Sequence, residues 1–344
     1  MKNNIYIGFD IGGANTKVTV FDNNFIIINV IFKNIKIWDN LNELSNFFNL
    51  ISSQYKLFNV SNYITITAES CDNFINRDKG IISVIKICNT TLFGKIFFYS
   101  NLGEYIEYNA AITCPKNLFS TNWLLTKKLV DLDNNIDLLI DIGSTTTDFI
   151  YNDIDIKFNL TDYDRLKNYN LLYLGVIRTP IPMVADYVMY KGSKLPLIRE
   201  LFATTGDVFN ITQDINFSTL DYIGADNRDY SNKNSLIRIA RTIGLDFKDK
   251  DKDEIEKTVF YIKNLLIEKI YKNVNLIFKN TKKLNISSVG EGKFLIKDMC
   301  RLHKINYINI SKNKYFNIPD TIDENLIYCN LPSALVVTNF FNKK

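Results

Sequence analysis

Histidine is nearly absent from this chain: its 344 residues include a single one, His303. A serine–histidine–aspartate site or a zinc site with several histidines needs more of them, or needs this one in a suggestive setting. His303 follows Met-Cys-Arg-Leu in a segment typical of a helix, with no serine or carboxylate beside it. We therefore expect it to have a structural role.

Cysteine is scarce and badly spaced for two common kinds of site. The five residues are odd in number and never form a Cys-x-x-Cys pair, which argues against a disulfide framework and against a zinc ribbon. They fit a reducing compartment, so we expect a cytoplasmic protein. The cysteines are Cys71, Cys88, Cys114, Cys300 and Cys329.

Charge of one sign and long hydrophobic runs are also missing. Lys and Arg number 41 against 37 Asp and Glu, a net charge of +4, which does not indicate nucleic acid or an anionic membrane as the main partner. Uncharged apolar runs such as Phe25–Phe32 are far shorter than the ~20 residues that cross a bilayer. Asp10 interrupts the first apolar stretch before a signal-peptide core could form. We expect a soluble protein.

What is present is a plan of strands and helices in the first third. The β-branched and aromatic runs Ile5–Asp10, Thr16–Asp22 and Phe25–Phe32 predict three antiparallel strands, because short turns of small and amide residues separate them. Leu41–Phe58 has apolar residues at helical spacing, and Tyr63–Thr67 predicts another strand.

The same plan begins again after residue 135. Each half opens with a strand that reaches an aspartate, continues with a turn of small residues and returns as a second strand, so the pattern predicts an internal duplication. The elements predicted in the second half are strands Ile136–Ile142 and Asp148–Tyr151, helix 251–279, strand Ile286–Val289, helix Lys293–Leu302, strand Asn306–Ile310 and a final helix from Pro332 through Phe341.

The two matched turns are the strongest chemical signal. Each places a carboxylate, Asp10 or Asp141, before glycine and hydroxyl or amide residues. Glycine allows close backbone approach to a ligand, and successive N–H groups form a nest for phosphate oxygens. The two aspartates could hold a hydrated Mg²⁺. A plain hairpin is the alternative, and the occurrence of two matched turns at the heads of duplicated halves argues against it. The predicted phosphate-binding residues are Gly12, Gly13, Asn15, Thr16, Lys17, Gly143, Ser144, Thr145 and Thr146.

Other phosphate loops fit poorly. Neither turn supplies the Gly-Lys-Ser/Thr of a Walker loop. Gly290-Glu291-Gly292 lies between a strand and a helix but lacks the third glycine of a dinucleotide fingerprint. In the duplicated context, Gly290 and Gly292 more plausibly line a nucleotide-like pocket.

Candidate substrate residues lie beyond these turns. Glu69 and Asp72 follow a strand end, where a carboxylate pair could grip an amine, a metal or a phenol, although Asp72 could instead cap a helix. Arg178 precedes Thr-Pro in a setting typical of an exposed turn; a surface ion pair is the alternative.

A second group of candidate residues combines acidic and basic side chains. Asp226 with Arg228 is either part of a site or an internal salt bridge. Arg238 and Arg241 lie three apart in a predicted helix and could anchor a carboxylate or diphosphate; a solvated helix face is the alternative.

These residues resemble a known superfamily. The two turns and Ser288–Gly292 are similar to the phosphate hairpins and adenosine turn of the acetate/sugar kinase–Hsp70–actin superfamily. Further blocks resemble its hydantoinase/oxoprolinase-like group, first described as a tetrahydromethanopterin-linked one-carbon transfer protein. These blocks are Thr67–Phe74, Tyr173–Pro180, Glu200–Val208, Ala225–Arg228 and Arg238–Arg241.

The resemblance implies an α/β protein with a duplicated ribonuclease-H-like fold, as in the ATPase domains of actin, Hsp70 and sugar kinases. It would have two lobes with mixed sheets and a central cleft that holds the ligand. The first lobe would cover residues 1–135, with a C-terminal helix at 331–344 packed back on it. The second would cover 136–330, with a substrate-side insertion at about 160–230.

The resemblance also implies a transferase of methanofuran or methylofuran biosynthesis. Family members join the phenol of γ-glutamyltyramine to an (aminomethyl)furan-methyl diphosphate, giving an aryl-alkyl ether and diphosphate, with Mg²⁺ and without consuming ATP. An ATP-dependent small-molecule kinase or amide hydrolase is the main alternative, and an actin-like assembly protein the second; a homo-oligomer is open. The site predicted is catalytic Asp10, Asp141, Glu69 and Asp148, with substrate contacts from Asp72, Arg178, Thr179, Asp207, Asp226, Arg228, Arg238, Arg241, Gly290 and Gly292.

Overall fold

The computed structural model describes residues 3–158, 160–219, 222–310 and 315–341. By their internal contacts, the residues form two compact units. Unit 1 comprises Met1–Asn134, Ile150–Arg165 and Ile310–Lys344, and unit 2 comprises Asn135–Phe149 and Leu166–Asn309. Residues 150–165 and 310–330, which the sequence analysis assigned to the second lobe, therefore group with the first. A ligand-binding cleft between the lobes stays a prediction.

Unit 1 is built on a sheet of six strands in the order β3-β2-β1-β4-β5-β6. The predicted antiparallel arrangement of β1, β2 and β3 is confirmed. β4 then lies parallel to β1, and β5 parallel to β4, so the chain must cross over through helices to reach them. The strands are β1 Asn4–Gly12, β2 Asn15–Phe21, β3 Ile27–Asn34, β4 Asn59–Thr67, β5 Lys95–Tyr99 and β6 Tyr105–Ile106.

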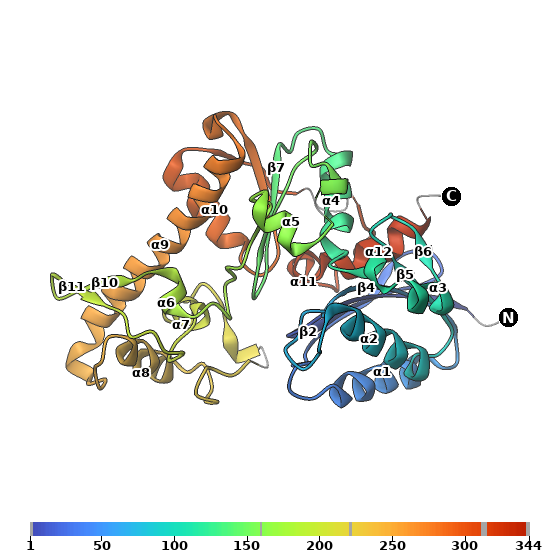
Figure 1. Ribbon diagram of the computed structural model, residues 1–344, viewed down its shortest axis with the longest axis horizontal. Helices are drawn as coiled ribbons and strands as arrows, with labels where there is room; N and C mark the ends of the chain where they lie inside the picture. Colours follow the sequence, from blue (N-terminus) through green and yellow to red (C-terminus); the bar gives the residue numbers. More distant parts are fainter. Residues whose placement is uncertain (1–2, 159, 220–221, 311–314, 342–344) are drawn as a thin grey trace. The chain divides into compact units, whose positions relative to one another are not determined.

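Helices cover both faces of this sheet (Figure 1). On one face, α1 (Asn42–Tyr55) and α2 (Arg77–Thr91) complete an apolar core in which Phe9 packs on Phe48, with ring centroids 5.3 Å apart. On the other face, α12 (Leu331–Phe341) approaches so closely that a Cβ on Gly8 would lie 1.8 Å from the Ser333 carbonyl oxygen. The alternation of Gly8 and Phe9 follows the two-residue period of a strand.

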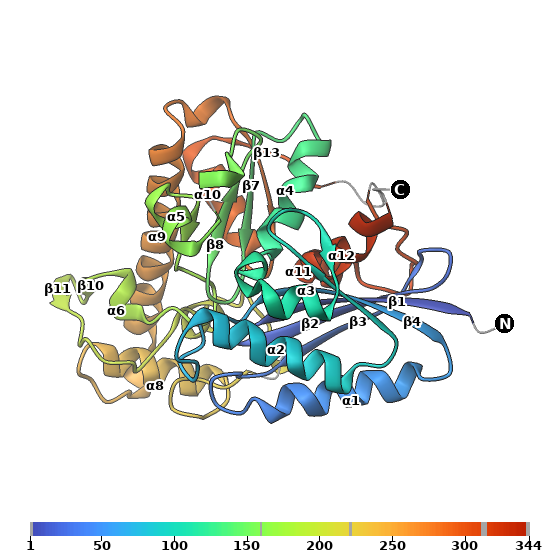
Figure 2. The same cartoon turned by 45° about the vertical axis from the view of Figure 1, so that its right-hand side comes forward.

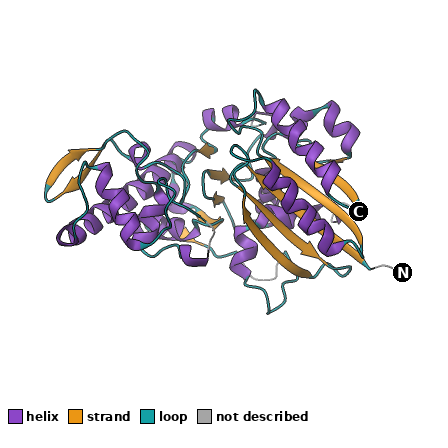
Figure 3. Cartoon of the chain, turned by 90° about the horizontal axis from the view of Figure 1, so that it is seen from below, coloured by secondary structure: helices purple, strands orange, loops and turns teal. Residues whose placement is uncertain are grey.

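The expected C-terminal helix over 331–344 corresponds to α12, and residues 342–344 lie outside the described part of the chain. The view in Figure 3 shows the strands of unit 1 lying among its helices. The remaining helices here are α3 Tyr108–Thr113, α4 Asn122–Leu132, which packs against α12, and α11 Glu324–Cys329, while α5 Asp162–Lys167 begins in unit 1.

Unit 2 repeats the same strand plan. Its sheet has the order β13-β12-β7-β8-β9, which matches β5-β4-β1-β2-β3 of unit 1 position by position. β12 lies parallel to β7 and β13 parallel to β12, as β4 and β5 do in unit 1. The predicted duplication and the ribonuclease-H-like fold class are therefore confirmed. The strands are β7 Leu138–Ile142, β8 Thr147–Ile150, β9 Leu171–Leu172, β12 Asn285–Val289 and β13 Asn306–Tyr307.

The long helix expected over 251–279 is α9, Lys252–Ile277, which packs against α10, Lys293–His303 (Figure 2). α10 in turn covers β7 and β12. An additional subregion follows β9 and precedes α9. It contains α6 Ile181–Val184, the hairpin of β10 Tyr187–Tyr190 and β11 Ser193–Pro196, α7 Thr205–Ile211 and α8 Asn232–Thr242.

His303 ends α10, and its ring stacks on Tyr271 with centroids 3.5 Å apart. Its Nε2 lies 3.0 Å from the Glu268 carboxylate, a neighbour that α9 supplies from a distant part of the sequence. All five cysteines are free thiols. Across the described ranges, no helix combines the length and apolarity required to cross a bilayer.

Candidate functional site

In unit 1, Asp10 lies near the carboxyl end of β1 with 6% of its surface exposed. It pairs across the sheet with Lys17 on β2 and with Thr65 on β4. The Thr65 hydroxyl in turn lies 2.7 Å from that of Thr121, which precedes α4. Cross-strand partners share a face of the sheet, so one carboxylate, one ammonium and two hydroxyls gather at the end of β1.

The glycine turn after β1 packs against the loop that follows β4. A Cβ on Gly13 would lie 2.7 Å from the Cys71 sulfur, so the loop can approach only because this residue is glycine. Asn15 and Thr16 of the predicted phosphate turn are buried, and Thr16 has no exposed surface. The turn therefore offers backbone groups to a ligand more readily than the Thr16 hydroxyl.

Glu69 lies just past β4 and is 2% exposed. Its Oε1 accepts a hydrogen bond of 2.6 Å from the Ser120 hydroxyl. No hydrogen bond to its Oε2 is found within the described ranges. Burial raises the pKa of Glu69 to about 7, against the lowering effect of the Ser120 hydrogen bond. A buried carboxyl that titrates near neutrality can act as an acid or a base.

Asp72 is exposed, and it does not cap the next helix. Asn76 caps α2 instead, because its side chain accepts a 2.9 Å hydrogen bond from the Lys79 amide. The capping alternative for Asp72 is therefore wrong, and this carboxylate remains accessible to a ligand.

In unit 2, the turn after β7 is held from two sides. The amides of Val176 and Arg178 donate to the carbonyl oxygens of Gly143 and Ser144, at 3.0 and 2.9 Å. On the other side, the Gly292 amide donates to Ile142 at 2.9 Å. A Cβ added to Gly143 would meet no atom within 4 Å. The backbone is therefore fixed while the face at Gly143 stays open for a ligand.

Two glycines let the neighbouring segments reach this turn. Gly290 has φ +86°, and a Cβ there would lie 2.8 Å from Oδ1 of Asp141. Gly175 is as tightly placed, since a Cβ would lie 2.3 Å from the Thr145 amide nitrogen. The positive φ of Gly290 and these contacts explain why glycine occupies both positions.

The predicted residues around the turn differ in exposure. Arg178 is exposed, and its Nη1 lies 3.5 Å from the Thr145 hydroxyl, so its cation stands beside the turn. Thr179 is buried, and its hydroxyl accepts a 2.8 Å hydrogen bond from the Gly175 amide. Asp148 is 9% exposed and pairs with Leu171 across β8 and β9. Of these three, only Arg178 presents its side chain to solvent.

Arg238 and Asp207 form an internal ion pair. Neither has exposed surface, and Arg238 Nε donates to Asp207 Oδ1 at 2.7 Å. Asp207 also closes the capping box of α7 through the Thr204 amide. Burial raises the pKa of Asp207, opposed by the nearby Arg238 cation. Both were predicted to contact substrate; their burial instead gives them a structural position between α7 and α8.

Asp226 extends this network toward the surface. It accepts a 2.9 Å hydrogen bond from Arg238 Nη1 and a 2.8 Å bond from Arg228 Nε, while Arg241 Nη1 lies 3.7 Å away. Burial works against ionisation of Asp226, but these hydrogen bonds prevail and lower its pKa to about 2. The internal salt bridge considered for Asp226 and Arg228 is present. The Arg228 and Arg241 side chains are 41% and 45% exposed and remain accessible.

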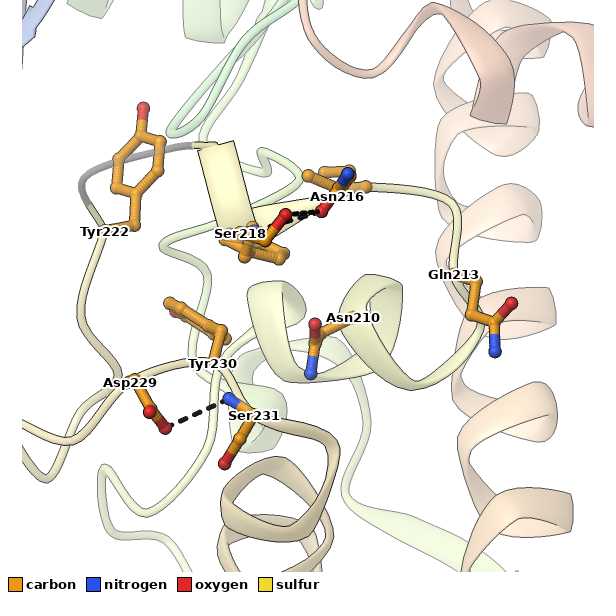
Figure 4. Close-up of a pocket in the computed structure, with 10 residues that line it drawn as sticks. Asn210, Gln213, Asn216, Ser218, Tyr222, Asp229, Tyr230 and Ser231 are labelled. Atoms are coloured by element: carbon orange, nitrogen blue, oxygen red, sulfur yellow. Dashed lines mark hydrogen bonds between the residues drawn. The ribbon is translucent and has the colours of Figure 1, made fainter.

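A pocket of about 690 Å³ opens beside this network in unit 2 (Figure 4). Its walls carry the amides of Asn210, Gln213 and Asn216, the ring of Tyr230 and the carboxylate of Asp229. No Lys or Arg is among its lining residues within the described chain. These walls suit a neutral or cationic polar group better than a diphosphate.

The sequence did not indicate Ser120 or Asp162 as site residues. Ser120 is 51 residues from Glu69 and 42 from Asp162 along the chain, yet its hydroxyl lies within hydrogen-bonding distance of both carboxylates. Neither residue belongs to a turn or block with a recognisable pattern. Only the folded chain reveals them, because it brings the residue two positions before α4 and the first residue of α5 close to Glu69.

The two sequence relatives described here share the same name. A (4-{4-[2-(gamma-L-glutamylamino)ethyl]phenoxymethyl}furan-2-yl)methanamine synthase of Methanocaldococcus jannaschii is 29% identical over 311 residues, 89% of this chain and 91% of that protein. A protein of the same name from Methanococcus vannielii is 33% identical over 182 residues, 52% of this chain and 82% of that protein. No family model matches the chain.

Solved structures align along nearly the whole chain at low identity. The activator of the 2-hydroxyisocaproyl-CoA dehydratase from Clostridium difficile is 12% identical, with a TM-score of 0.44 and coverage of 98% of this chain and 96% of that one. Component A of the Acidaminococcus fermentans (R)-2-hydroxyglutaryl-CoA dehydratase is 8% identical, with a TM-score of 0.44 and 98% coverage of both. No functional conclusion follows from similarities at this level.

Proposed function

Since this chain belongs to the family of (4-{4-[2-(gamma-L-glutamylamino)ethyl]phenoxymethyl}furan-2-yl)methanamine synthases, we propose that it makes the ether in that product. The bond formed joins the phenol oxygen of γ-glutamyltyramine to the methylene carbon of an (aminomethyl)furan-methyl diphosphate. Diphosphate leaves with the electron pair of the broken carbon–oxygen bond. The reaction makes the protein a transferase of methanofuran-type cofactor biosynthesis. We also propose that the chain belongs to the hydantoinase/oxoprolinase-like group, because its residue blocks resemble that group. We propose a cytoplasmic location as well.

The observation that carries this proposal is the pair of matched glycine turns, each with an aspartate at its strand end. A departing diphosphate concentrates negative charge, and fixed N–H groups and cations stabilise such charge as it develops. In unit 2, the turn at Gly143 has an open face, and Arg178 stands beside it. In unit 1, Lys17 on β2 lies opposite Asp10 in the register of the sheet. A furan-methyl carbon tolerates positive charge, so we expect a loose transition state.

The site that we propose for Mg²⁺ has few protein ligands. No group of three or more His, Cys, Asp or Glu that could hold a metal occurs in the described part of the chain. Mg²⁺ usually takes one or two carboxylates, keeps several waters and completes its shell with substrate phosphates. Asp10 and Asp141 are the carboxylates that would hold it. When bound, Mg²⁺ would neutralise charge on the leaving diphosphate.

The phenol requires a proton acceptor, because its ordinary pKa is about 10. Glu69 suits this role: it is buried, and its pKa of about 7 leaves it largely ionised above neutrality. Its hydrogen bond from Ser120 occupies Oε1, and Oε2 has no protein donor among the described residues. We therefore assign Glu69 as the base.

The test uses purified protein with Mg²⁺, γ-glutamyltyramine and (aminomethyl)furan-methyl diphosphate. Diphosphate release is measured by a coupled phosphate assay, and the ether is measured by mass spectrometry. Equal amounts of ether and diphosphate, without ATP, are expected. A requirement for stoichiometric ATP hydrolysis, or diphosphate release without ether, would contradict the proposal.

An ATP-dependent kinase or amide hydrolase is the alternative that the same assay separates. Adding ATP should leave the rate of ether formation unchanged and produce no ADP. ADP formation that depends on either substrate would favour the alternative instead.

A further inference from the structure

Ser120 is an unusual residue between two carboxylates. It is 8% exposed and has φ +47°, a left-handed conformation that is unfavourable for a residue other than glycine. Its hydroxyl lies 2.6 Å from Oε1 of Glu69 and 3.0 Å from Oδ1 of Asp162, the first residue of α5. Backbone strain at such a position persists only where the surrounding structure enforces it.

One hydroxyl has one hydrogen, and here two carboxylate oxygens lie within its reach. When Glu69 and Asp162 are both ionised, the Ser120 hydrogen can satisfy only one of them, and the two charges repel. A proton on Glu69 removes that conflict, because the ionised Asp162 then becomes the stronger acceptor for the hydroxyl. The direction in which Ser120 donates therefore follows the protonation of Glu69.

Burial favours the protonated form of Glu69. Its carboxyl is 2% exposed, and desolvation disfavours the charged form of a buried group. The charged groups that act on Glu69 come from two other elements. They are Asp162 on α5, which favours protonation, and Arg77 on α2, which opposes it.

We propose that Ser120 and Asp162 are positioning residues that set the proton affinity of Glu69 in opposite directions, resting on the proposed ether synthesis. As the phenol oxygen bonds to the methylene carbon, its proton passes to Glu69 and the diphosphate leaves with its electron pair. The Ser120 hydrogen then turns from Glu69 to Asp162. Return of the Glu69 proton to water completes the cycle.

The experiment measures kcat/KM for ether formation from pH 5 to 9. Ser120→Gly removes the hydroxyl that stabilises ionised Glu69, and glycine adopts the left-handed backbone conformation without strain. The acidic limb of its profile of kcat/KM against pH should move up by about one pH unit. Asp162→Asn removes the repulsion and can donate to Ser120, so its acidic limb should move down by a similar amount. Glu69→Gln should lower kcat at least ~100-fold at every pH.

Controls separate this proposal from a merely structural role. Ser53→Ala on α1 and Asp153→Asn are matched substitutions at exposed positions, and they should leave the acidic limb in place. Ser120→Ala loses the same hydroxyl and keeps the left-handed backbone strain that Ser120 already has, so it should shift the acidic limb as Ser120→Gly does but have a lower Tm than Ser120→Gly. The proposal would be overturned if the acidic limbs of Ser120→Gly and Asp162→Asn move in the same direction. It would also be overturned if these limbs do not move although the variants are folded. Failure of the wild type to make ether would instead overturn the proposed function.

Discussion

The guanidinium of Arg238 and the carboxylate of Asp207 lie 2.7 Å apart, and neither side chain has any surface exposed to solvent. Gly224 is adjacent, since a Cβ there would lie 2.4 Å from Cζ of Arg238. The pair joins α7 to α8 and fixes Asp226, whose exposed neighbours Arg228 and Arg241 stay available to an anionic substrate. Arg238, which was predicted to bind substrate, is thus enclosed, whereas the side chains of Arg228 and Arg241 are partly exposed.

Replacing Arg238 by Met should destabilise the protein by about 3–5 kcal/mol, because Asp207 would keep a buried charge without its partner. Denaturant unfolding measures this free energy. Arg199→Met is the matched control, since its side chain is 80% exposed and its effect should stay within ~1 kcal/mol. The double variant with Asp207→Asn should recover part of the loss. Equal stability of Arg238→Met and wild type would show that the pair contributes nothing.

Two glycine substitutions should differ in their effects on stability and on kinetics. Gly290→Ala forces a Cβ into a left-handed position and against Asp141, so it should lower stability by at least about 1–2 kcal/mol together with turnover. Gly143→Ala places its Cβ in open space, so Tm should change little while the KM for the furan-methyl diphosphate rises several-fold. Thermal unfolding and steady-state kinetics measure both. An unchanged KM for Gly143→Ala would mean that its open face is not a ligand surface, and a large fall in Tm would mean that the face is not open.

The two aspartates at the strand ends should matter for turnover and not for folding. Asp10→Asn and Asp141→Asn should each reduce kcat about 100-fold or more, because each removes a carboxylate proposed to hold the Mg²⁺ that would neutralise the leaving diphosphate. Circular dichroism should be unchanged. Asp39→Asn, an exposed carboxylate of unit 1, is the control and should keep the wild-type rate. Near wild-type rates for both strand-end variants would remove these carboxylates from the mechanism.

Stability should depend on pH through Glu69. Its folded pKa of about 7 lies above the ordinary glutamate value of 4.5, so the folded state binds the proton more tightly. The stabilising contribution is full below pH ~4.5 and is lost as the pH rises through ~7. Wild type should therefore lose about 2–3 kcal/mol relative to Glu69→Gln between pH 4.5 and 8. Urea unfolding at each pH tests this, with the exposed Glu104→Gln as a control that should track wild type.

Much of the fold followed from local pattern. Runs of β-branched and aromatic residues located β1 to β4, and helical spacing located α1, α9 and α10 to within a few residues. The repeated strand–turn–strand pattern with Asp10 and Asp141 predicted the duplication that the two sheet orders confirm. These features depend on neighbours in the sequence, so the sequence suffices to find them.

Pairings between distant residues could not be predicted in the same way. Both Asp72 and Arg238 were predicted as substrate contacts, with a helix cap and a solvated helix face as the alternatives. The structure shows that Asn76 caps α2 and that Arg238 is buried, so neither alternative holds. The grouping of residues 150–165 with unit 1 depends on which chain segments touch after folding.

The amino-acid sequence by itself determined the strand plan, the two glycine turns and the carboxylates that head them. It did so because hydrophobic period, glycine and aspartate act within a few residues of one another. Tertiary structure alone decided that Glu69 is buried, that Ser120 lies between it and Asp162, and that Arg238 is enclosed with Asp207. Desolvation and hydrogen bonding set the proton affinity of these groups, and both arise only when separate elements pack together.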